Sequence, residues 1–270
     1  MKTYRRVLTI AGSDSGGGAG IQADLKTFSA LGCYGMTAIT ALTAQNTCGV
    51  TAIHPVPAAM VGAQIEAVLT DIGVDAIKIG MLNTPEVIEE VARQLRGCEA
   101  VPIVLDPVMV SKSGAKLLHD EAIAALRQIL IPLATIITPN IPEAEVLSGQ
   151  TIRAREEFET AAATLLKLGP QAVLVKGGHL AGPTSPDCLL AAGAPPRWLE
   201  APRLITRNLH GTGCTLSAAI AAHLARGLEL AAAVAAAKEY LGAALAAGAA
   251  YQLGQGQGPV RHFFATWPED

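Results

Sequence analysis

Short apolar runs alternate with longer amphipathic or alanine-rich stretches over the first two thirds of the chain. The short runs, many of them rich in β-branched residues, predict strands at 7–10, 36–42, 76–79, 101–105, 135–138 and 172–175. The longer stretches predict helices at 19–30, 58–72, 85–95, 120–130 and 155–168. Repeated strand–helix–strand units favour a mostly parallel sheet with helices on both faces, and uniformly apolar strands are typical of a sheet buried on both sides.

The pattern changes after Gly178, where shorter apolar runs at 188–191 and 198–199 are separated by prolines. This segment predicts an antiparallel edge of the sheet. From Thr212 onwards the sequence predicts two long helices with a break at Gly227. Because no linker, repeat or shift in composition divides the chain, we expect residues 1–270 to form a single α/β domain.

Charge and hydropathy exclude two classes of protein. The 270 residues include 20 Lys plus Arg against 23 Asp plus Glu, a formal net charge of -3, and the basic residues are scattered. Nucleic-acid-binding proteins concentrate their basic charge, so that class is disfavoured. Hydrophobic residues make up 50% of the chain. The most apolar stretch, 228–251, is interrupted by Glu229, Lys238 and Glu239, which favours buried helices and no membrane span.

The start of the chain and its cysteines predict a cytoplasmic location. The charged segment 1–6 leads into an apolar run that is too short for the apolar region of a secretory signal. The five cysteines are widely spaced and include no Cys-x-x-Cys pair. This distribution fits a reducing compartment and predicts neither a zinc site nor a disulfide framework.

Polar, glycine-rich segments follow the predicted strands, at the edge where an open parallel sheet binds its ligands. The segment 11–20 contains five glycines and precedes a helix that carries Asp24. These glycines allow a ligand to approach the backbone closely, and a flexible turn is the alternative interpretation. Their spacing fits neither a P-loop nor a dinucleotide-binding fingerprint.

The ends of the next strands carry side chains suited to a heterocycle and to Mg²⁺. The amide of Gln45 can read ring donors and acceptors, and the thioether of Met81 can lie against a ring. Asp106, Asn140 and Glu143 offer the oxygen donors that Mg²⁺ prefers. The alternatives are a turn at Asp106 and a helix-capping box formed by Asn140 and Glu143.

The most specific signal is the segment 210–215, with the sequence HGTGCT, directly before an apolar helix. Consecutive backbone amides at a helix N-terminus form an anion site. A turn capped by Thr215 is the alternative, but it leaves Cys214 unexplained. A thiol at a helix N-terminus is expected to have a pKa below its ordinary value of about 8.5, which makes it a better base or nucleophile. A Ser-His-Asp hydrolase is disfavoured because the chain has no Gly-x-Ser-x-Gly elbow.

Long motifs in seven segments closely resemble the hydroxymethylpyrimidine/phosphomethylpyrimidine kinases of thiamine biosynthesis, in the ribokinase superfamily. The segments are 11–24, 45–46, 80–81, 106–114, 138–149, 175–179 and 210–217. The resemblance implies a ribokinase-like three-layer α/β/α sandwich with a mostly parallel central sheet. It also implies that ATP phosphorylates 4-amino-5-hydroxymethyl-2-methylpyrimidine and then its monophosphate, with Mg²⁺ as cofactor. Because related kinases are often dimers, we expect a homodimer.

The resemblance further implies roles for individual residues. The pyrimidine pocket would be lined by Gly12, Asp24, Gln45, Met81 and Val108. Mg²⁺ and its waters would be organised by Asp106, Thr138, Asn140 and Glu143. ATP would be bound by Lys176, Thr212 and Lys238. The transferring phosphoryl group would lie among the implied catalytic residues, Lys176, Gly211, Gly213 and Cys214.

One position departs from the wider superfamily, most of which carries aspartate where this chain has Cys214. The thiol is shared with some close relatives that act on pyridoxal, so pyridoxal kinase is the nearest alternative function. The segment 13–24 favours the pyrimidine enzyme. A catalytically inactive nucleotide-binding regulator of the same fold is the second alternative, because fold alone does not fix function. The intact set of Asp106, Lys176 and the segment 211–214 argues against an inactive regulator.

Overall fold

The computed structural model describes residues 2–109 and 120–268, and within them nine strands form one sheet in the order β3-β2-β1-β4-β5-β6-β7-β8-β9. The strands are β1 (Arg6–Asp14), β2 (Tyr34–Asn46), β3 (Gly49–Pro55), β4 (Ala76–Ile79), β5 (Ile103–Leu105), β6 (Ile136–Ile137), β7 (Ala172–Lys176), β8 (Asp187–Ala191) and β9 (Arg197–Leu199). Neighbours from β2 to β7 are parallel. β3, β8 and β9 pair antiparallel. The mostly parallel sheet and the antiparallel edge after β7 are therefore confirmed.

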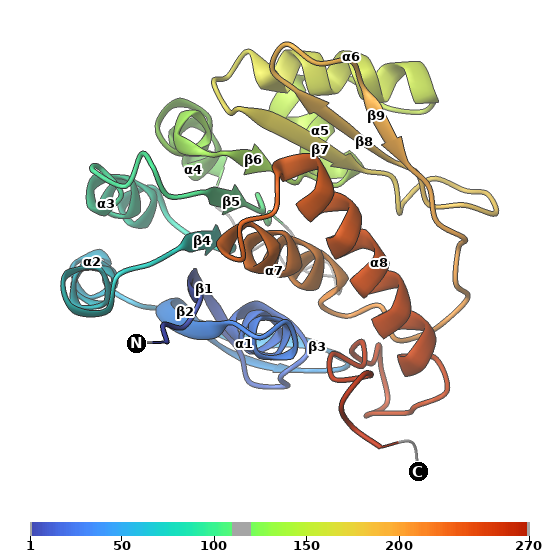
Figure 1. The fold of residues 1–270 in the computed structure, drawn as a ribbon, viewed down its shortest axis with the longest axis horizontal. Helices are drawn as coiled ribbons and strands as arrows, with labels where there is room; N and C mark the ends of the chain where they lie inside the picture. The colour runs from blue at the N-terminus through green and yellow to red at the C-terminus, as the bar shows by residue number, and fades with distance from the viewer. Residues whose placement is uncertain (1, 110–119, 269–270) are drawn as a thin grey trace.

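Helices cover both faces of the sheet. One layer contains α1 (Gly20–Ala30), α7 (Thr212–Ala225) and α8 (Leu230–Gly248), which lie together in Figure 1. The other layer contains α2 (Ala58–Ala67), α3 (Pro85–Gln94), α4 (Asp120–Ala125), α5 (Ile141–Ser148) and α6 (Arg155–Leu166). Successive strand residues face opposite layers, since Val7 packs in the first core and Leu8 and Ile10 pack in the second. The predicted three-layer architecture is confirmed.

Local chemistry explains where several helices begin and end. α3 begins after Thr84, whose hydroxyl accepts the Val87 N–H, and Pro85 occupies the first helical turn. Gly227, with a φ of 86°, lies between the end of α7 and the start of α8, at the break that the sequence predicts. α2 and α4 continue as π-helical turns at Val68–Ile72 and Leu126–Leu130, and a 3-10 turn follows at Ile131–Leu133.

The structure departs from the predicted elements at β3 and α5. The hydrophobic pattern does not predict β3 because its side chains are exposed or half-buried and its apolar residues do not alternate cleanly. α5 is a single short helix whose apolar pattern is too brief to stand out. β1 and β2 also extend further than predicted, to Asp14 and Asn46, so Gln45 lies inside a strand and not behind one.

α8 is long and apolar enough to cross a membrane by length and composition alone. The same test is passed by core helices of water-exposed domains, and α8 packs one face against α7 through Val234, Ala237 and Tyr240. Its Lys238 contacts Asp187 at the end of the sheet. Only 28% of the apolar window of α8 is buried, so the predicted buried helix holds for this one face and not for the whole helix.

Candidate active site

A cavity of about 420 Å³ lies beyond the carboxyl ends of β1, β2, β4, β5, β6 and β7, beside the N-terminus of α7. It is at the edge of the sheet where open α/β folds bind ligands. Of the residues singled out from the sequence, twelve line it together: Gly12, Gln45, Met81, Asp106, Val108, Asn140, Glu143, Lys176, Gly211, Thr212, Gly213 and Cys214. Segments far apart in the sequence therefore converge on one site.

Three other predicted site residues do not line the cavity. Thr138 is buried behind Asp106 and donates its hydroxyl hydrogen to Asp106 Oδ1 at 3.3 Å, so it positions that carboxylate. Lys238 Nζ contacts Asp187 Oδ2 at 2.5 Å and donates to the Ser185 carbonyl at 2.8 Å. These contacts tie α8 to the loop before β8, and the prediction that Lys238 reaches the bound phosphates is not supported.

Asp24 is the third exception, and the prediction that it lines the pyrimidine pocket is wrong. Its side chain is fully buried, where Oδ2 accepts the Thr9 hydroxyl at 2.6 Å and pairs with Lys78 Nζ at 2.8 Å. Burial alone would lower the pKa of Lys78, but the charge of Asp24 raises it. Lys78 itself lines the cavity, so Asp24 acts behind it. Asp24 lies one turn inside α1, where its side chain faces the sheet and not the edge of the sheet that bears the cavity.

Backbone irregularities lie at two cavity residues, Gly12 and Gln45. The pairing of β1 with β2 shifts register between Ala11 and Ser13, at Gly12, and the pairing of β2 with β3 shifts between Ala44 and Gln45. Such bulges redirect side chains. A Cβ on Gly12 would approach Met81 Sδ at 3.1 Å, so glycine leaves room for the thioether.

The β1–α1 loop is closed around a carboxylate and is not a loose turn. The side chain of Asp14 accepts the N–H groups of Gly16, Gly18 and Ala19 at 2.8, 3.0 and 2.8 Å. Burial would raise the pKa of Asp14, but hydrogen bonds from His210 and from the Ala19 amide lower it. These amides are therefore occupied by the protein's own carboxylate.

Cys214 lies in the first turn of α7 and is partly exposed in the cavity. Gly211, the N-cap, has a φ of 77°, and a side chain there would collide with the Gly18 carbonyl. Burial, reinforced by nearby carboxylates, raises the pKa of Cys214 to about 11, although Lys78 and the Gly20 amide oppose the rise. The prediction of a depressed thiol pKa is wrong, because burial and the charges of Asp24 and Asp106 outweigh Lys78 and the Gly20 amide.

Asp106 and Glu143 make part of the cavity wall acidic, and Lys176 is paired with Asp106 there. Lys176 Nζ lies 2.9 Å from Asp106 Oδ1. Burial and the charge of Asp106 raise the pKa of Glu143 to about 7, while the charge of Lys176 opposes this. Asn140 and Glu143 also form a capping box on α5, with bonds of 3.0 and 2.8 Å, so the capping interpretation is confirmed alongside their place in the cavity.

The donor set fits Mg²⁺ held through waters or phosphates better than Mg²⁺ held directly. In the described part of the chain, no three acidic, histidine or cysteine side chains are arranged to ligate one metal ion. Two carboxylates, Asp106 and Glu143, nevertheless face one cavity, and their mutual charge is of the kind that a hydrated cation relieves.

Sequence reasoning missed four charged or titratable cavity residues: Asp14, Lys78, His179 and His210. Lys78 carries a clear signal, since a lysine inside the apolar run of β4 has to be paired when that strand is buried. Asp14 and His210 lie in motif segments, but only the fold brings them together.

Comparison with known proteins identifies relatives over nearly the whole chain. The model of the family described as phosphomethylpyrimidine kinase matches residues 14–261. The hydroxymethylpyrimidine/phosphomethylpyrimidine kinase of Rhizobium meliloti is 54% identical over 97% of this chain and 98% of that protein. The enzyme of the same name from Escherichia coli is 48% identical over 96% and 98%. A thiamine biosynthesis bifunctional protein of Geobacter sulfurreducens is 51% identical over 96% of this chain, which spans 52% of that relative.

Solved structures with similar folds include two kinds of kinase. An ADP complex of Bacillus subtilis pyridoxal kinase aligns with a TM-score of 0.88 at 41% identity, covering 96% of this chain and 98% of that one. A phosphomethylpyrimidine kinase from Clostridium difficile aligns with a TM-score of 0.77 at 48% identity, covering 87% and 97%. These neighbours confirm the ribokinase-like fold. With a family model that matches most of the chain, and relatives near half identity over their full length, the chain belongs to the phosphomethylpyrimidine kinase family.

Proposed function

We infer that this chain uses ATP to phosphorylate the hydroxymethyl group of 4-amino-5-hydroxymethyl-2-methylpyrimidine, and then the monophosphate to the diphosphate, in thiamine biosynthesis. The observation that carries this assignment is one cavity that is lined both by Gly12, Gln45 and Met81, which suit a ring, and by Cys214 at the α7 N-terminus. Relatives near half identity carry the same activity in their names. A volume of about 420 Å³ suits a small ring and its phosphates.

On the acceptor side, Gln45 would bind the aminopyrimidine edge while Met81 and Val108 pack against the ring faces. A thioether is soft and polarisable, and makes favourable contacts with aromatic rings. The hydroxymethyl oxygen would then point toward Cys214, since both walls belong to one cavity.

On the phosphoryl side, the backbone amides from Gly211 to Cys214 would stabilise the transferring group, aided by the partial positive charge of the α7 N-terminus. Lys176 and Thr212 would contact the phosphates of ATP. Asp106, Asn140 and Glu143 would hold hydrated Mg²⁺, which supplies neutralising charge for phosphoryl transfer when bound.

Cys214 would accept the proton of the hydroxymethyl group as the acceptor oxygen forms its bond to phosphorus. The proton passes from the substrate oxygen to Sγ, so the sulfur has to be a thiolate at that moment. With a pKa near 11, only a small fraction of the unliganded enzyme carries that thiolate at neutral pH. The monophosphate acceptor, with a second pKa near 6, needs no base.

Pyridoxal kinase is the second candidate, because Staphylococcus aureus pyridoxal kinase bound to ADP aligns with a TM-score of 0.90 at 36% identity. The deciding experiment measures ATP turnover by the purified chain with the pyrimidine alcohol, its monophosphate and pyridoxal. We expect kcat/KM for the pyrimidine to exceed that for pyridoxal. A preference for pyridoxal would reverse the assignment, and no turnover with any acceptor would favour the inactive regulator. The homodimer and the cytoplasmic location stay predictions.

A further inference from the structure

Asp14 and His210 have no role in the reaction described so far, yet both touch the site beside Gln45. His210 Nε2 lies 2.8 Å from Asp14 Oδ2 and 3.2 Å from the side-chain nitrogen of Gln45. The side chains of His210 and Asp14 are only 13% and 3% exposed. All three residues line the cavity. A half-enclosed histidine–carboxylate pair therefore contacts the side chain that is proposed to read the pyrimidine.

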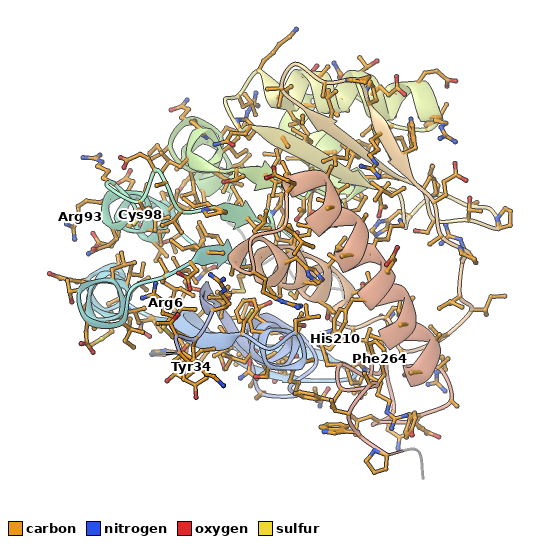
Figure 2. All side chains as sticks on the ribbon, in the orientation of Figure 1. Arg6, Tyr34, Arg93, Cys98, His210 and Phe264 are labelled. Atoms are coloured by element: carbon orange, nitrogen blue, oxygen red, sulfur yellow. The ribbon has the colours of Figure 1, made fainter. Side chains whose placement is uncertain are left out.

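The structure fixes the imidazole ring in one place. The backbone N–H of His210 donates to the Gly258 carbonyl at 3.0 Å. Its ring, labelled in Figure 2, packs on Gly18 so closely that a Cβ at position 18 would collide with Cδ2. The next residue, Gly211, packs against the Gly18 carbonyl. His210 is thus held by the same glycine contacts that join the β1–α1 loop to α7.

The hydrogen on the ring nitrogen is assigned by Asp14. That carboxylate already accepts three backbone N–H groups, and its pKa is lowered, so it is ionised at neutral pH. An ionised carboxylate offers only acceptors. At 2.8 Å, His210 Nε2 therefore carries a hydrogen and donates it to Asp14.

This assignment fixes the polarity of Gln45. A ring nitrogen that carries a hydrogen has no lone pair for an N–H of Gln45. At the other end of the amide, Thr43 Oγ1 lies 2.9 Å from the Ser13 carbonyl oxygen and 3.1 Å from Gln45 Oε1, and its single hydrogen serves only one of these acceptors. Turning the terminal amide by half a turn removes the clash between two donors at His210: the amide oxygen then shares the ring N–H with Asp14 in a three-centre bond, with the shorter arm to Asp14. The amide nitrogen donates to the Thr43 hydroxyl oxygen, which leaves the Thr43 hydrogen for the Ser13 carbonyl.

We propose that His210, held by Asp14, is a specificity-determining positioning residue that sets this orientation of the Gln45 amide. The amide oxygen then accepts from the substrate's amino group on the His210 side, and the amide N–H donates to the ring nitrogen on the Thr43 side. A pyrimidine with a carbonyl in place of the amino group presents the opposite polarity, an acceptor beside a ring N–H. The site rejects that 4-oxo analogue.

The inference rests on the proposed role of Gln45, and its test is a discrimination ratio. The purified chain is assayed with ATP and either the amino substrate or the 4-oxo analogue. We expect kcat/KM to favour the amino substrate at least ~100-fold, because mismatched polar groups in a site are left unpaired. In His210→Leu the amide loses the ring N–H that holds its oxygen, and the ratio falls at least ~10-fold. In His210→Gln a side-chain N–H replaces that of the ring, and most of the ratio returns.

Controls separate this effect from a general loss of structure. His54 is an exposed histidine on β3, and His54→Leu is expected to keep the wild-type ratio. Melting temperature and the KM for ATP are measured for every variant. If His210→Leu does not fold, Asp14→Asn tests the same ratio. The asparagine amide can donate to the ring, which releases the hydrogen on Nε2, and the ratio again falls.

The possible results separate the role of His210 from the role of Gln45 and from the proposed kinase activity. A ratio unchanged in folded His210→Leu, with both substrates slowed equally, overturns the inference alone. Gln45→Leu is expected to lower kcat/KM for the amino substrate by ~30- to 1,000-fold, since its partners on the ligand are left unbonded. Unchanged kinetics in folded Gln45→Leu would remove Gln45 from the site and the inference with it. Failure of the wild-type chain to phosphorylate the pyrimidine would reject the proposed function itself.

Discussion

Lys78, in the cavity wall, forms an ion pair with Asp24 behind it, with Lys78 Nζ 2.8 Å from Asp24 Oδ2 and neither side chain exposed to solvent. Lys78 comes from β4 and Asp24 from α1, so the pair joins the sheet to the helix that follows the glycine-rich loop. A Cβ on Gly80 would approach Lys78 Nζ at 2.8 Å, so glycine leaves room for the ammonium group. The pair places a fixed positive charge near Cys214.

Breaking this pair from one side should be costly. We expect Lys78→Met to lower the free energy of unfolding by ~3–5 kcal/mol, because it leaves Asp24 charged and buried without its partner. The double variant Lys78→Met/Asp24→Leu should regain most of that loss. Urea unfolding monitored by circular dichroism measures both. Exposed Lys167 provides the matched control, since Lys167→Met should change the free energy by less than ~0.5 kcal/mol. A double variant less stable than Lys78→Met would contradict the account.

His262 predicts how stability depends on pH. Burial, with the charge of Lys26 adding, lowers the pKa of His262 to about 4, and its Nε2 faces the Thr215 hydroxyl at 3.0 Å. Because the unfolded histidine titrates near 6.5, the unfolded state binds the proton first. The contribution of neutral His262 to the free energy of unfolding is therefore present above pH 6.5 and is lost as pH falls toward 4, by ~2–3 kcal/mol in all.

The measurement is the free energy of unfolding between pH 7 and pH 4.5 for the wild type and His262→Gln, which keeps an acceptor for Thr215 but does not titrate. The variant should lose less stability than the wild type over this range. His54→Gln, at an exposed position, should follow the wild-type curve. Parallel curves for the wild type and His262→Gln would show that His262 is not the group responsible.

The sequence predicts the layers of this fold well because burial alone specifies them. Val7 and Leu8 are both apolar since each packs against a different helical layer. β3 escapes prediction because it is an edge strand whose stability comes from pairing with β2 and not from a buried face. Motif positions at strand ends, such as Asp106 and Lys176, are correctly brought to one cavity by topology.

Predictions failed where the environment of a side chain depends on distant segments. The local sequence places Cys214 at a helix N-terminus, which favours the thiolate. Its pKa is set instead by burial and by carboxylates from other elements, Asp24 and Asp106. The burial of Asp24 similarly depends on its pairing with Lys78, which lies 54 positions away in the sequence.

Asp106 tests the proposed metal site. Asp106→Asn removes a negative charge that faces the cavity, so the Mg²⁺ concentration for half-maximal rate should rise and kcat should fall. Initial rates across a Mg²⁺ titration at saturating ATP measure both. Exposed Asp71 supplies the control, because Asp71→Asn should leave the titration unchanged. A wild-type Mg²⁺ dependence in Asp106→Asn would limit Asp106 to holding Lys176 and the turn after β5.

The two acceptors should respond differently to pH. A thiol with a pKa of about 11 gains thiolate roughly tenfold per pH unit below that value, so kcat/KM for the pyrimidine alcohol should rise from pH 7 to pH 9. The monophosphate is already mostly deprotonated at pH 7, and its kcat/KM should change little over the same range. Equal slopes for both acceptors would assign the rise to another group.

The most direct test of the account compares the two phosphorylation steps in Cys214→Ala. This change keeps the backbone amide at position 214 but removes the sulfur that is proposed to accept the alcohol's proton. Each step is measured separately with purified pyrimidine alcohol or purified monophosphate, under conditions where the wild type saturates. We predict that kcat falls by ~10²-fold or more with the alcohol and clearly less with the monophosphate, which has no proton to lose. Equal losses in both steps would contradict this, and Cys214 would then serve the shape of the phosphoryl site and not the transfer of a proton.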